Sequence, residues 1–204
     1  MAGLDPERVR ANLERVRERI GGAVEICAAV KYLAAEDLPA LAEAGISLVG
    51  ENRAQELAAK QDAHGELFEW DFIGALQSRK VKEVAPRVRL IHSVASESAL
   101  AQLERHPVGE VLLQVNIAGE EGKAGIAPSD LGDFIARCPV PVGGLMTMPP
   151  LAERPDDSRP HFARLAELAA EHGLERLSMG TSQDYEAAVA EGATIVRLGS
   201  VLYN

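Results

Sequence analysis

Short apolar runs rich in Val, Ile and Leu alternate along this chain with longer stretches rich in Ala, Leu and Glu that have the character of helices. The apolar residues within each run are nearly continuous and do not alternate with polar ones. Parallel strands that are covered on both faces have this continuous pattern. We therefore predict eight strands, at residues 24–30, 46–50, 70–74, 88–92, 110–116, 141–145, 175–178 and 194–198.

Helical patterns fill most of the gaps between these strands. The opening stretch, MAGLDPERVRANLERVRERI, predicts a charged helix that precedes the first strand. In the longest later helix, Ser158 is placed to cap the start and Gly173 suits the left-handed position after the end. The later helices are predicted at residues 36–44, 52–61, 77–84, 96–104, 129–136, 159–172 and 182–190.

About eight strand–helix units favour an α/β fold, a single (β/α)8 TIM barrel with an extra N-terminal helix. The alternative is an open, doubly wound sheet. Its glycine fingerprint, GxGxxG, is missing from the first strand–helix turn, where Lys31 stands instead. We expect residues 1–204 to form one domain.

Composition and charge exclude several classes of protein. The formal net charge of -10 argues against a nucleic-acid-binding surface, which needs clustered cations. No apolar stretch approaches the roughly 20 residues that span a bilayer, and the N-terminus lacks the apolar centre of a secretory signal. We therefore expect a cytoplasmic protein that binds neither nucleic acid nor membrane. Cys27 and Cys138 are expected to be reduced, small core residues.

Candidate chemistry gathers where the predicted strands end, which is where barrels of this kind hold their sites. After the seventh strand, Thr181 and Ser182 open a helix, and the unpaired N–H groups of a helix start hold phosphate well. After the eighth strand, Gly199 and Ser200 offer a close backbone approach and a hydroxyl group. Each of these residues alone is ordinarily a cap or a turn residue. Together, at two adjacent strand ends, they favour a phosphate site.

Lys31 follows the first apolar run, and a lysine in such a place ordinarily reaches into water. Opposite a phosphate site, however, a partly desolvated lysine has a lowered pKa, because burial disfavours its charged form. The neutral amine is the nucleophile that attacks an aldehyde. A lysine and an aldehyde that carries a phosphate are the two halves of a pyridoxal 5'-phosphate (PLP) Schiff base.

Eight segments of the chain form a family pattern: AAVKYL, LVGENRAQE, FIGALQSRKVKEV, LIHSVAS, VLLQVNIAGEEGKAGI, GLMTMPP, LSMGTSQDYEAAVAEG and IVRLGSVLY. Through them the sequence resembles the pyridoxal phosphate homeostasis protein family over nearly its whole length. The resemblance implies a single PLP-binding barrel like the N-terminal domain of alanine racemase, a cofactor held as a Schiff base, and little or no catalytic turnover.

The resemblance assigns roles to single residues. Lys31 matches the Schiff-base lysine, and Arg197 matches the arginine set against the pyridine nitrogen. One departure is Val30, where many members have Ser; it leaves the lysine itself in place. The other expected cofactor-binding residues are Asn52 and His92 along the ring, Met146 at the end of the sixth strand, and Ser182, Gly199 and Ser200 at the phosphate.

A permanent cation beside the ring nitrogen disfavours protonation of that nitrogen and weakens the cofactor as an electron sink. We therefore expect a carrier that buffers or delivers PLP and is not an enzyme, with apo PLP enzymes as acceptors and a monomeric state. A PLP-dependent amino-acid racemase is the alternative, but the chain ends at Asn204 without the extra domain that supplies a tyrosine in alanine racemase. A Schiff-base aldolase is disfavoured because its lysine usually lies on a later strand.

Overall fold

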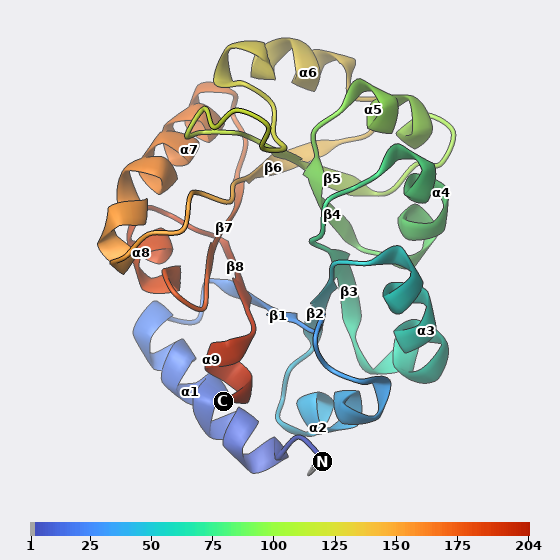
Figure 1. The fold of residues 1–204 in the computed structure, drawn as a ribbon, viewed down its shortest axis with the longest axis vertical. Coiled ribbons are helices and arrows are strands. Elements are labelled where there is room, and N and C mark those ends of the chain that lie inside the picture. The colour runs from blue at the N-terminus through green and yellow to red at the C-terminus, as the bar shows by residue number, and fades with distance from the viewer. Residues whose placement is uncertain (1–2) are drawn as a thin grey trace.

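The computed structural model describes residues 3–204, which contain a closed barrel of eight parallel strands surrounded by helices (Figure 1). Neighbouring strands pair in sequence order, and β8 pairs back to β1, with Cys27 opposite Arg197. The predicted (β/α)8 barrel is therefore confirmed. The strands are β1 (Glu25–Ala29), β2 (Leu48–Glu51), β3 (Glu69–Phe72), β4 (Leu90–Val94), β5 (Glu110–Gln114), β6 (Val142–Met146), β7 (Arg176–Thr181) and β8 (Ile195–Leu198).

Nine α-helices lie along residues 3–204, and the helices between strands form the outer ring in Figure 1. The last of them, α9, was not predicted, because a single turn is too short to show a helical period. Met1 and Ala2, which open the predicted N-terminal helix, lie outside the described residues. The helices are α1 (Pro6–Ile20), α2 (Leu38–Glu43), α3 (Ala54–His64), α4 (Val81–Val84), α5 (Glu97–Leu103), α6 (Leu131–Arg137), α7 (Arg159–Glu171), α8 (Tyr185–Ala190) and α9 (Ser200–Tyr203).

The extra helix α1 packs outside the barrel against α2, α8 and α9 (Figure 1). Its start is set by Asp5, whose side chain accepts a hydrogen bond from the N–H of Glu7, and by a proline at the first helical position. The side chain of Asn12 is buried and donates to the carbonyl oxygens of Leu202 and Asn204, at 2.9 and 3.0 Å. The helix α1 thereby holds the C-terminal turn, which borders the site described below.

The predicted cap of α7 is wrong in one respect. Gly173 takes the expected left-handed conformation, with φ of 65°. Ser158, however, makes no capping hydrogen bond, because a short 3-10 helix (Pro155–Ser158) precedes α7 and gives Ser158 helical backbone angles. A capping residue needs an extended backbone for its side chain to reach back to the N–H groups of the first turn.

The apolar core has two parts. A large cluster lies between the sheet and the helices, and a small one, which includes Cys27, Leu112 and Met146, lies inside the barrel. Cys27 is buried as expected, whereas Cys138 is only partly buried, and both are free thiols. No helix within residues 3–204 is long and apolar enough to cross a membrane.

Candidate functional site

A cavity of about 740 Å³ lies at the C-terminal ends of the strands. This volume falls in the range of sites for small ligands and cofactors. All predicted cofactor-binding residues line the cavity except His92. Its lining includes Lys31, Asn52, Gly74, Gln114, Met146, Met148, Thr181, Ser182, Arg197, Gly199, Ser200 and Tyr203.

Lys31 stands in the turn after β1, at the edge of the cavity. We predicted that it ends the strand and is partly desolvated. Instead the strand ends at Ala29, Val30 takes the buried position, and the side chain of Lys31 is exposed. Its Nζ lies 4.7 Å from the ring centre of Tyr32, which is itself 86% exposed. The amine is therefore accessible to a ligand in the cavity without being enclosed by the protein.

The loops after β7 and β8 meet at the hydroxyl group of Ser182. Its oxygen accepts hydrogen bonds from the N–H groups of Gly199, at 3.0 Å, and Val201, at 3.3 Å. We predicted that the N–H groups after Ser182 open a helix. They do not, because α8 begins only at Tyr185. The hydroxyl hydrogen of Ser182 and the N–H and exposed hydroxyl groups of Ser200 remain as donors around one corner of the cavity.

Thr181 is the last residue of β7, and its polar groups point elsewhere. Its N–H and its hydroxyl group both donate to Asp184 Oδ1, at 2.7 and 3.0 Å. Thr181 therefore shapes the loop, while its neighbour Ser182 accepts from N–H groups that follow β8.

Asn52 follows β2 and lines the cavity. Its Oδ1 atom is buried and has no hydrogen-bond partner within residues 3–204. A buried acceptor without a partner is unfavourable in a folded protein, so it marks a place where a ligand group can donate. The neighbouring Gly74 allows this arrangement, because a Cβ atom there would lie 2.0 Å from the carbonyl oxygen of Asn52.

Arg197, from β8, reaches the base of the cavity from inside the barrel. It donates to Ser178 Oγ at 2.6 Å and to the carbonyl oxygen of Thr147 at 3.0 Å, and it also contacts Met148 Sδ. Among the described residues no carboxylate pairs with it, although its side chain is almost fully buried. Burial lowers the pKa of Arg197 to about 10, so the guanidinium is still charged at neutral pH.

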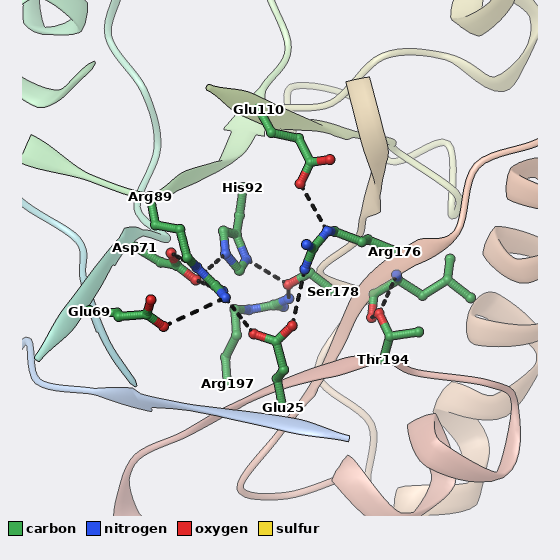
Figure 2. Close-up of polar contacts among 11 residues, drawn as sticks. Glu25, Glu69, Asp71, Arg89, His92, Glu110, Arg176, Ser178, Thr194 and Arg197 are labelled. Atoms are coloured by element: carbon green, nitrogen blue, oxygen red, sulfur yellow. Dashed lines mark hydrogen bonds and ion pairs between the residues drawn. The ribbon is translucent and has the colours of Figure 1, made fainter. Parts of the chain in front are cut away.

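His92 does not line the cavity, which corrects the predicted place of its side chain. It is fully buried, with Nδ1 2.8 Å from Ser178 Oγ and Nε2 3.0 Å from Asp71 Oδ2 (Figure 2). The sequence placed His92 near a strand end. The strand β4, however, runs on to Val94, so the His92 side chain lies inside the barrel behind Ser178 and Arg197. Burial lowers the pKa of His92, against the opposing effect of Asp71, so the imidazole is neutral.

Arg197, Ser178, His92 and Asp71 form a chain of hydrogen bonds, and the charges at its ends determine where its protons lie. Burial alone raises the pKa of Asp71, but hydrogen bonds from His92 and Arg89 outweigh it, so the group is a carboxylate. A carboxylate accepts the Nε2–H of a neutral His92, which leaves Nδ1 as an acceptor for the Ser178 hydroxyl group. The oxygen of Ser178 then accepts from Arg197. Donation therefore runs in one direction, from Arg197 to Asp71.

Beyond Asp71 the polar chain continues to the opposite end of the barrel (Figure 2). Arg89 joins Asp71 to Glu25 at the start of β1, with N–O distances of 2.9 and 2.7 Å. Arg176 then joins Glu25 to Glu110. Sequence reasoning missed Ser178, Thr147 and Tyr203 as neighbours of the site. Ser178 and Thr147 stand in strand-end segments that the sequence did single out.

Several known proteins are similar to this chain over almost its whole length. The family model described as the alanine racemase N-terminal domain matches residues 4–204. The pyridoxal phosphate homeostasis proteins of Aquifex aeolicus and Pseudomonas aeruginosa are each 39% identical to this chain over 97% of its length, covering 96% and 94% of those proteins.

Solved structures of the PipY protein of Synechococcus elongatus are also similar. The sequence identity is 31%, and the matched region covers 96% of this chain and 100% of the PipY chain. The TM-score is 0.88 for PipY without PLP and 0.84 for PipY with PLP bound.

Proposed function

Because the chain belongs to the pyridoxal phosphate homeostasis protein family, we propose that it binds PLP in this cavity as a Schiff base with Lys31 and buffers or delivers the cofactor. The observation that carries the proposal is that a single cavity is lined by an accessible amine, a buried arginine and a cluster of hydrogen-bond donors that suits a phosphate. Bound PLP supplies an aldehyde for the amine and a pyridine ring.

The chain's own groups divide the work of binding. The hydroxyl group of Ser182 and the hydroxyl and N–H groups of Ser200 hold the phosphate, because hydrogen bonds to a charged acceptor are the strong ones. Lys31 supplies the nucleophile from the turn after β1, the strand that neighbours β8. The unpartnered Oδ1 of Asn52 accepts a hydrogen bond from the ligand, and Met146 contributes apolar surface inside the barrel.

Arg197 favours a carrier over a catalyst. Its guanidinium only donates hydrogen bonds, so a ring nitrogen that faces it has to act as an acceptor and stay unprotonated. An unprotonated ring is a weak electron sink, which slows the removal of a proton from a bound amino acid. Formation and exchange of the Schiff base need no such sink. A role without turnover, with apo PLP enzymes as acceptors and a monomeric state in the cytoplasm, forms part of this proposal.

The experiment that tests the site is reduction with borohydride. Purified protein incubated with PLP should turn yellow, and borohydride should fix a pyridoxyl group on the peptide that contains Lys31. Lys31→Ala should bind PLP without this label. Lys80 and Lys123 form ion pairs with glutamates and do not line the cavity. Label on either of them, with none on Lys31, would therefore refute the assignment.

A further inference from the structure

A buried ion pair lies behind the wall of the cavity, between β2 and α3. Lys60 Nζ is 2.6 Å from Glu51 Oε2, and the two side chains are 3% and 0% exposed. Lys60 belongs to the buried face of α3, together with Ala54 and Leu57. Neither member of the pair lines the cavity. The pair therefore makes no direct contact with a ligand there.

The pair is tied to the two loops that carry Lys31 and Asn52. Lys60 Nζ also donates to the carbonyl oxygen of Val30 at 2.7 Å, on the peptide bond that leads into Lys31. On the other side, Glu51 Oε1 accepts hydrogen bonds from the N–H groups of Asn52, at 2.6 Å, and Arg53, at 3.2 Å. Two loops from adjacent strands are thus held by one ammonium and one carboxylate.

Stability alone does not require charges at this place. Removing two charges from water is costly, and well-packed apolar residues often stabilise a core as well as a buried ion pair does. What the charges supply is direction, because the ammonium fixes one backbone carbonyl group and the carboxylate fixes two backbone N–H groups. The exposed side chain of Lys31 pairs with no carboxylate within the described chain, so its place depends on its backbone.

We propose that Lys60 and Glu51 are positioning residues that fix the Lys31 and Asn52 loops relative to one another, so that the amine approaches the aldehyde of a cofactor anchored by its phosphate. This inference rests on the function proposed above. In the step concerned, the Lys31 nitrogen forms a double bond to the aldehyde carbon, and the aldehyde oxygen leaves as water with the two amine hydrogens. Holding reacting groups in place is what accelerates such a step.

The test compares Lys60→Met with the parent in two measurements. The first is the rate of Schiff-base formation with PLP, followed by absorbance. The second is the affinity for pyridoxine 5'-phosphate, which carries the same phosphate and ring but no aldehyde. In Lys60→Met the carboxylate of Glu51 still holds the Asn52 loop, while the carbonyl oxygen of Val30 loses its donor. We therefore expect the rate to fall by about tenfold or more and the affinity to change by less than about threefold. A purely structural role would move both or neither.

Controls separate positioning from general damage. Lys80→Met removes a lysine from a surface ion pair, and Leu165→Ala destabilises the core of α7, so both should react at the parent rate. If Lys60→Met does not fold, the double variant Glu51→Gln/Lys60→Met removes both charges together and should react as slowly. Schiff-base formation at the parent rate in either variant, or an equal slowing in Leu165→Ala, would overturn the inference.

The proposed function and this inference fail in different ways. If the parent protein shows no borohydride label on Lys31, the proposed function fails and takes the positioning role with it. If the parent is labelled and Lys60→Met reacts normally, only the positioning role is lost.

Discussion

Ser182 and Ser200 illustrate how two hydroxyl groups in one corner of a cavity differ in what surrounds them. Ser182 is partly buried and already accepts from two N–H groups, whereas Ser200 is exposed. Loss of Ser182 therefore leaves two backbone donors without their acceptor, in addition to removing the proposed phosphate contact. Loss of Ser200 removes only the proposed phosphate contact.

Ser182→Ala and Ser200→Ala should both weaken PLP binding. A hydrogen bond to a charged group is worth about 1.5–3 kcal/mol, which is roughly tenfold or more in affinity. Titration of each variant with PLP measures the effect, with Ser129→Ala, in the turn before α6, as a control. Parent-like affinity in both Ser182→Ala and Ser200→Ala would show that the phosphate lies elsewhere.

The loops after β2 and β3 together shape one side of the cavity. They touch through Gly74, where the backbone of Asn52 occupies the space that a side chain would need. Together with the Glu51–Lys60 pair, this contact determines where the unpartnered Oδ1 of Asn52 points. A glycine in a strand-to-helix loop thus acts on the site through the neighbouring loop.

Gly74→Ala should displace the Asn52 loop and lower PLP affinity, because the added Cβ would lie 2.0 Å from a backbone oxygen that has little room to yield. Overpacking of this kind costs about 1–3 kcal/mol of stability. The matched control is Gly109→Ala, because nothing lies within 4 Å of its added Cβ. Thermal unfolding and PLP titration of both variants check this, and equal behaviour would contradict the contact.

At the scale of the whole molecule, the polar chain inside the barrel links the site to the opposite end. Asp71 and His92 lie in the middle of this chain and are both fully buried. Their protonation therefore affects the stability of the barrel as a whole.

Stability should fall in acid. The pKa of His92 lies below its ordinary value of 6.5, so below pH 6.5 the unfolded chain binds more protons than the folded one. The free energy of unfolding should then decrease by at most about 1.4 kcal/mol per pH unit from this group. Asp71 adds a further loss below its ordinary pKa of 3.8. Urea unfolding between about pH 8 and about pH 2.5 measures both losses, because this range extends below the ordinary pKa of each group.

His92→Gln is the control for this pH dependence. It should remove the part of the slope that begins near pH 6.5, even if it lowers stability at every pH. An unchanged slope in this variant would assign the acid sensitivity to other groups.

The whole protein should transfer PLP without turning over amino acids. Loaded protein incubated with an apo PLP enzyme should restore that enzyme's activity, whereas alanine and serine of either hand should be racemised or transaminated barely above the rate of free PLP. Turnover on the order of 1–1000 per second that disappears in Lys31→Ala would restore the racemase hypothesis.

The sequence by itself determined the barrel and seven of the residues that line the cavity. Strands and helices follow from the local spacing of apolar residues. The residues that follow parallel strands meet at one end of a barrel, whatever the exact pairing between neighbouring strands. Lys31 and Ser182 could therefore be assigned to one site before any coordinates were considered, and the family resemblance added Asn52 and Arg197 to it.

Only the tertiary structure decided which groups touch. Barrel closure placed His92 behind Arg197 and joined Lys60 to Val30. The length of the turn after β1 left Lys31 exposed, and a 3-10 turn removed the capping role of Ser158. These outcomes depend on strand ends, side-chain direction and contacts between residues far apart in the chain. A local pattern carries no information about such contacts, because their energies arise only when the elements have packed.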